Sequence, residues 1–119
     1  MSTVLVVLVA VFFLGMGLYA LALPARVLSI FGVAVTSVDG RNEVRAVYGG
    51  YGIAVGVVLL AALELPAYRD GILVCQAVGV AGMAAGRLLS AAIDRPPGFY
   101  PWFFCAVEAL LAGALLAAV

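Results

Sequence analysis

Apolar residues occupy four long stretches of this chain, and short polar segments separate them. We place the stretches at Val4–Leu23, Glu43–Leu63, Ile72–Ile93 and Pro101–Val119. Each is close to the ~20 residues that an α-helix needs to cross a hydrocarbon core of about 30 Å. Unbroken apolar runs such as Val4–Leu14 lack the period-two alternation of a half-buried β-strand. The pattern therefore predicts four membrane-spanning α-helices.

Composition supports the same fold class. Of the 119 residues, 67% are hydrophobic, and only six are basic and six acidic. So few charges cannot cover the surface of a water-soluble domain. Backbone groups in lipid must satisfy one another, which helices achieve within a single segment. We predict an all-α, integral membrane four-helix bundle that forms one transmembrane domain over residues 1–119, a multi-pass protein of the cell membrane.

The three links between the stretches differ in character. Glu64–Gly71 is short and contains turn residues, and Asp94–Tyr100 carries Pro96-Pro97-Gly98, a strong helix stop. The link Pro24–Asn42 is longer and partly apolar, so we predict a short interfacial helix between helices one and two. The side of the first and third links carries Arg26, Arg41, Arg45 and Arg95, and the opposite side carries Arg69 alone. This asymmetry predicts that the two links are cytoplasmic and both termini lie outside.

Charge and residue types exclude several function classes. The net charge is zero and the six arginines are dispersed, so we expect no nucleic-acid partner. The chain has no histidine, so the usual haem and zinc ligands are missing and no metal site is predicted. The first stretch contains no aspartate, glutamate, lysine or arginine, which argues against a small transporter. The sequence does not specify a cofactor.

Two ionisable residues fall well inside the predicted spans. Arg87 and Glu108 lie nearly symmetrically about the Pro96-Pro97 turn. An antiparallel hairpin therefore brings them to the same depth, about 10 Å below the interface at ~1.5 Å per residue. An isolated charge at that depth costs several kcal/mol, and an opposite charge facing it lowers the cost. We predict that Arg87 and Glu108 pair.

Polar residues of three predicted helices gather in the same half of the membrane. On helix three, Gln76, Met83, Arg87, Ser90 and Asp94 recur at helical spacing along one face. Helix two starts on the same side and adds polar groups near its beginning. Ionisable residues inside membranes are candidates for function, although they also serve as interhelical glue. The candidate ligand-binding set is Glu43, Arg45, Tyr48, Arg87, Ser90, Asp94 and Glu108.

Small residues form a second pattern, on helix two. Gly49, Gly52 and Gly56 share one face, and Gly50 and Ala54 share the opposite face. Small residues allow helices to approach closely in lipid, so the pattern predicts neighbours on both faces of this helix.

Two segments resemble a known family. Arg41–Gly50 (RNEVRAVYGG) and Gly86–Ser90 (GRLLS), followed by Asp94, resemble a bacterial four-span family catalogued as domain of unknown function 4345, which is similar to the DoxX-like membrane proteins. The resemblance covers nearly the whole chain. Members often carry Asp-Gly where this chain has Asp94-Arg95. The resemblance implies a fold and a bacterial inner-membrane location, and it brings no activity.

Two functions remain open at this stage. The first is a binding protein for a small amphiphile or lipid in the polar intramembrane pocket, or an accessory subunit of a membrane complex. The second is an intramembrane enzyme, an isomerase or quinone-linked activity, with buried carboxylates as acid and base and Arg87 holding an anionic group. Membrane lipids are expected partners under both. A quinone, a membrane-protein complex or a homo-oligomer is compatible with either.

Overall fold

A computed structural model describes residues 1–95 and 97–119 and contains four helices long and apolar enough to cross a membrane. The first is α1 (Ser2–Ala22). The second, Val38–Ala62, is continuous and consists of α3 (Val38–Val44), η2 (Arg45–Gly50) and α4 (Tyr51–Ala62). The third and fourth are α5 (Arg69–Ile93) and α6 (Phe99–Ala118). The predicted all-α class and the four spans are confirmed.

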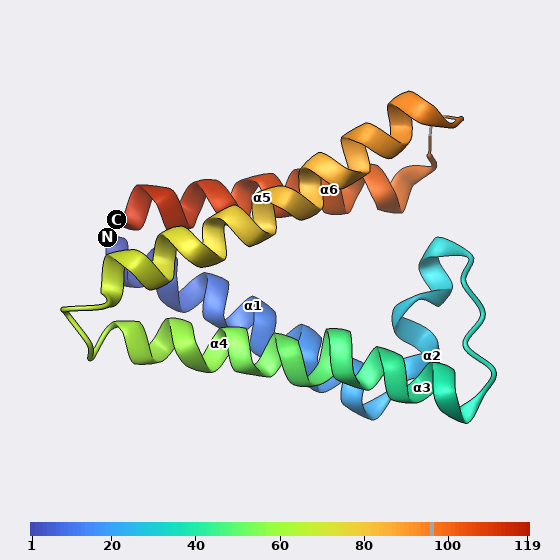
Figure 1. The fold of residues 1–119 in the computed structure, drawn as a ribbon, viewed down its shortest axis with the longest axis horizontal. Coiled ribbons are helices and arrows are strands. Elements are labelled where there is room, and N and C mark those ends of the chain that lie inside the picture. Colours follow the sequence, from blue (N-terminus) through green and yellow to red (C-terminus); the bar gives the residue numbers. More distant parts are fainter. Residues whose placement is uncertain (96) are drawn as a thin grey trace.

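The helices are arranged as two antiparallel hairpins. Figure 1 shows α1 beside the helix α3–η2–α4, and α5 beside α6. The N-terminus, the C-terminus and the turn between α4 and α5 lie at one end of the molecule, which we call the terminal end. The first link and the α5–α6 turn lie at the other, the link end. Part of the predicted stop at that turn, Pro96, lies outside the described residues.

The first link contains two short helical segments in place of one. These are α2 (Pro24–Val27) and the 3₁₀ turn η1 (Ser29–Phe31). The second span then begins at Val38, five residues before the predicted Glu43. Ser37 explains the earlier start, because its side chain accepts a hydrogen bond from the Gly40 amide at 2.9 Å and so caps the helix.

The core lies in the terminal half of the bundle, and every span contributes to it. Its fully buried large side chains are Val6 and Val9 of α1, Leu59 of α4, Leu73 of α5 and Leu115 of α6. Lipid is as apolar as these residues, so close van der Waals contact provides most of the attraction between the helices. A smaller cluster of Ala20, Val27 and Val44 attaches the first link to the bundle.

Glycine brings α1 and the second span together. A Cβ built at Gly17 would lie 2.7 Å from the Ile53 backbone nitrogen, and one at Gly56 would lie 2.9 Å from the Ala10 carbonyl oxygen. The predicted close approach on the Gly49, Gly52 and Gly56 face is therefore present. The Gly50 face differs: a Cβ there would meet, among the described residues, only the Arg45 carbonyl oxygen of its own helix, at 3.7 Å.

The segment η2 is π-helical, which no feature of the sequence had indicated. A π turn spans five residues in place of four, which widens the helix and shifts the faces of the residues that follow. π turns are rare in proteins, and a large share of those that occur lie at functional sites. Here the six residues Arg45–Gly50 hold two of the candidate binding residues, Arg45 and Tyr48.

Candidate functional site

Arg87 of α5 and Glu108 of α6 form a bidentate ion pair. The Arg87 Nε donates to Glu108 Oε2 at 2.8 Å and to Oε1 at 3.0 Å, and Nη2 donates to Oε1 at 2.9 Å. The Glu108 side chain is 6% exposed and that of Arg87 27% exposed. The predicted pairing is confirmed. Its geometry is the planar fork that makes arginine–carboxylate pairs both strong and directional.

Aromatic rings cover the guanidinium. The Arg87 Cζ lies 5.4 Å from the centre of the Phe31 ring and 5.9 Å from that of Phe104. These are cation–π distances. Phe31 comes from η1 on the first link, whereas Phe104 precedes Cys105, whose thiol approaches the Ala84 carbonyl oxygen at 3.7 Å. Sequence reasoning missed Phe31, because nothing in the sequence places the first link against α5 and α6.

One edge of the Arg87 guanidinium has no hydrogen-bond partner among the described residues. Arginine has five N–H donors, and Glu108 engages those of Nε and Nη2. Within the part of the chain that the structure describes, Nη1 contacts no acceptor. A donor at this depth gains from any acceptor that enters, such as water, a lipid carbonyl or a ligand. The pair therefore stabilises the hairpin and still offers hydrogen bonds.

An open cavity of about 440 Å³ lies between the first link and the second span. Glu43 and Tyr48 line it, and Arg87 does not. The other lining residues are mostly apolar: Leu28, Val33, Ala34, Val35, Thr36, Ser37, Gly40, Val44 and Val47. The volume falls in the usual range for small-molecule sites.

The first link brings the cavity close to the ion pair. Leu28 and Val33 of the link line the cavity, and Phe31 of the same link covers Arg87. Tyr48 lines the cavity from the opposite side, on η2. The cavity and the ion pair are thus neighbouring sites that share the first link.

The remaining candidate residues lie elsewhere. Arg45 turns toward α1, where its Nε donates to the Leu21 carbonyl oxygen at 3.0 Å and caps the end of that helix. Ser90 is exposed on α5. Asp94 is exposed beyond the end of α5 and accepts a hydrogen bond from the Arg95 amide at 2.8 Å. We still predict that all seven candidate residues line one concavity.

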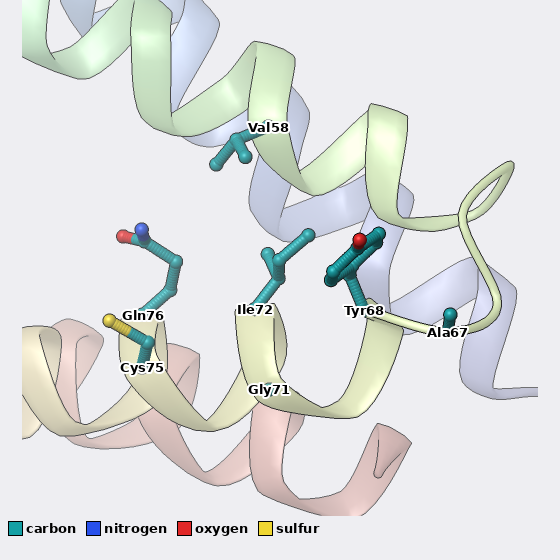
Figure 2. A pocket seen from close by; sticks show the side chains of 7 residues that line it. All are labelled: Val58, Ala67, Tyr68, Gly71, Ile72, Cys75 and Gln76. Carbon is teal, nitrogen blue, oxygen red and sulfur yellow. The ribbon is translucent and has the colours of Figure 1, made fainter.

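Gln76, at the other end of the polar face of α5, borders a second open cavity. Its volume is about 350 Å³, and Figure 2 shows Gln76 projecting from α5 toward Val58 of α4. The lining also includes Tyr68, Ile72 and Cys75. Among the described residues, its lining contains no aspartate, glutamate, lysine or arginine. We therefore centre the functional site on the first cavity.

Arg69 is a structural residue that the sequence reading passed over. Its Nη1 donates to the Ala118 carbonyl oxygen at 2.8 Å and to Asp70 at 3.1 Å, and its Nη2 donates to the Ser2 hydroxyl at 3.1 Å. One side chain at the start of α5 thereby ties both chain termini together. The signal in the sequence was that the last predicted helix ends on the same side of the membrane as Arg69, and the last carbonyl groups of a helix need donors.

These features define the class: a small multi-pass helical membrane protein with a buried ion pair beside a cavity. The profile of the family described as "Domain of unknown function (DUF4345)" matches residues 1–119, and the chain belongs to this family. The resemblance to domain of unknown function 4345, predicted from Arg41–Gly50 and Gly86–Ser90, is confirmed. Comparison with curated proteins and with solved structures gave no match.

Proposed function

We propose that this protein binds one small amphiphile in the cavity between the first link and the second span. The observation that carries the proposal is the cavity itself: about 440 Å³, mostly apolar walls, and two polar residues, Glu43 and Tyr48. Ligand sites commonly combine a largely apolar lining with a few polar groups that orient the ligand. An alkyl chain suits the walls, and a polar head suits the two polar groups.

The charge of the lining favours one kind of head group. Glu43 is the one ionisable acidic or basic side chain in the lining, and it forms no ion pair within the described residues. A carboxylate accepts hydrogen bonds and attracts positive charge. The Tyr48 ring and hydroxyl can contact a cation or an N–H group. The preferred amphiphile therefore has an amine or another hydrogen-bond donor as its head.

The setting of the protein supports a ligand that comes from the bilayer. The second of the four apolar spans forms one wall of the cavity, so an amphiphile dissolved in lipid reaches it without crossing water. We place the protein in a bacterial inner membrane, the location that the family resemblance implies. Membrane lipids are then its constant neighbours and compete for the same cavity.

Glu43 also keeps an enzymatic alternative open. Glu108 is held by three hydrogen bonds from Arg87, so it is poorly suited to exchange protons with a substrate. Glu43 has no such partner and faces the cavity, so it is the carboxyl that could act as a general acid or base. Chemical conversion of the bound molecule by the wild-type protein, lost in Glu43→Gln, would favour this alternative over simple binding.

Filling the cavity tests the proposal. We expect Val47→Trp to abolish most co-purification of a small molecule with the protein, because Val47 lines the cavity and an indole occupies the space. Val57→Trp is the matched control, since Val57 lies on the same span, is 55% exposed against 50% for Val47, and does not line the cavity. The measurement is mass spectrometry of an organic extract of each purified protein.

The same experiment can contradict the proposal. Equal amounts of the same molecule in the extracts of both variants would mean that it binds outside the cavity. A stable protein partner in mild detergent, with no specific small molecule in the wild-type extract, would favour the role of accessory subunit.

A further inference from the structure

The two hairpins are joined differently at the two ends of the molecule. At the terminal end, the core residues Leu59, Leu73 and Leu115 interlock and Arg69 ties Ser2 to Ala118. At the link end, Figure 1 shows the α1–α4 hairpin and the α5–α6 hairpin diverging, with the first link rising between them. There η1 of the link contacts α6. Fewer packed residues hold the link end than the terminal end.

Phe31 makes the contacts that cross this gap. Its ring lies 5.5 Å from the Phe104 ring of α6, centre to centre, and 5.4 Å from the Arg87 guanidinium of α5. One side chain of the first hairpin's link thus touches both helices of the second hairpin. It also covers the face of the ion pair described above.

The segment that carries Phe31 is lightly anchored. The η1 turn has three residues and none of them is buried. It ends at Gly32, whose φ of 77° is a left-handed conformation that glycine adopts without strain. The chain then runs without regular structure to Ser37. Segments with few buried contacts open at low free-energy cost.

We propose that Phe31 is a latch: when its ring leaves Arg87 and Phe104, the two hairpins separate at the link end while the terminal end stays closed. Release uncovers the Arg87–Glu108 pair and the neighbouring thiol of Cys105, which is 8% exposed in the closed form. The latch segment also forms one wall of the 440 Å³ cavity, through Leu28 and Val33. Opening of the latch therefore widens the cavity and joins it to the ion pair.

The native cysteines report on release. Cys105 of α6 is buried and Cys75 of α5 is exposed, so the rate of alkylation by N-ethylmaleimide at Cys75 is an internal reference. In detergent micelles we expect Phe31→Leu and Phe31→Ala to raise the Cys105 rate, relative to that of Cys75, by about tenfold. A partly desolvated cation–π contact changes an opening equilibrium by this factor. Ile30→Ala, which removes a neighbouring exposed side chain, should leave the ratio unchanged.

A distance measurement decides the proposal. Spin labels at Val38, at the start of α3, and Ile93, at the end of α5, mark the two hairpins at the link end, and both sites are more than 70% exposed. In a background with both native cysteines replaced by alanine, Phe31→Leu should lengthen and broaden the distance distribution, and Ile30→Ala should not. If both Phe31 variants give the same distance distribution as the protein that keeps Phe31, the proposal is overturned, whatever the alkylation rate of Cys105. Phe31→Leu keeps apolar volume, so a failure of Phe31→Ala to fold does not prevent the test. Neither measurement uses a ligand, so the latch and the proposed binding function fail separately.

Discussion

Replacing Glu108 with leucine is expected to destabilise the folded protein by about 3–5 kcal/mol, the cost of leaving one member of a buried ion pair without its partner. The Arg87 guanidinium keeps its charge at any accessible pH, so after the substitution it remains charged inside the membrane with its Nε and Nη2 donors unpaired. Reversible unfolding in mixed micelles of a mild and a denaturing detergent measures the change in free energy.

The reciprocal substitution should be milder. In Arg87→Leu, the unpaired Glu108 can take up a proton and become neutral, which reduces the loss to about 1–2 kcal/mol, the value of an interhelical polar contact. The double variant Arg87→Leu/Glu108→Leu should recover most of the stability lost in Glu108→Leu, because no charge remains to be desolvated. If Arg87→Leu proves the more damaging single change, the ion pair does not govern the stability of the α5–α6 hairpin in the way described.

The second large effect is expected at Gly17. A Cβ at this position would lie 2.7 Å from the Ile53 backbone nitrogen and 2.8 Å from the Gly49 carbonyl oxygen. Backbone atoms cannot turn aside as a side chain can, so Gly17→Ala must push α1 away from the second span. We expect a loss of about 2 kcal/mol or more, within the range of overpacking in a well-packed core. The same unfolding measurement applies.

Gly15 provides the matched control on the same helix. A Cβ at Gly15 would meet nothing within 4 Å among the described residues. Gly15→Ala should therefore be neutral, or stabilising by up to ~1 kcal/mol through the better helix propensity of alanine. Equal losses in the two variants would show that α1 and the second span do not pack through Gly17.

The sequence predicts the spans and the ion pair well, for clear physical reasons. Span length is dictated by membrane thickness, and four apolar stretches of suitable length leave little choice of fold. The pairing of Arg87 with Glu108 was predictable because a short turn fixes the register of an antiparallel hairpin. Two opposite charges at one depth also lower each other's desolvation cost. The glycine face of the second span was predictable for a similar reason, since Gly49, Gly52 and Gly56 recur at helical spacing.

Other parts of the site depend on contacts that no local pattern encodes. Phe31 belongs to an irregular link, so its place over Arg87 follows from tertiary packing alone. Arg45 caps α1 through the Leu21 carbonyl oxygen, a contact that the sequence did not predict. The π turn at Arg45–Gly50 alters which way Tyr48 faces, and helical periodicity assumes a regular α-helix. The position of the cavity relative to the ion pair therefore depends on tertiary contacts that the sequence pattern does not reveal.

Photolabelling tests the central claim, an amphiphile in the first cavity, most directly. The probes are dodecylamine and dodecanoate that carry the same diazirine in the chain, presented to the protein in phosphatidylcholine vesicles and analysed by peptide mass spectrometry. We expect the amine to label residues 28–48, the segment that contains the cavity lining, well above the lipid-facing parts of the spans. The fatty acid should label this segment less, because Glu43 repels it. Labelling spread evenly over exposed side chains such as Val57, Val78 and Leu110, with no preference for residues 28–48 or for the amine, would contradict it.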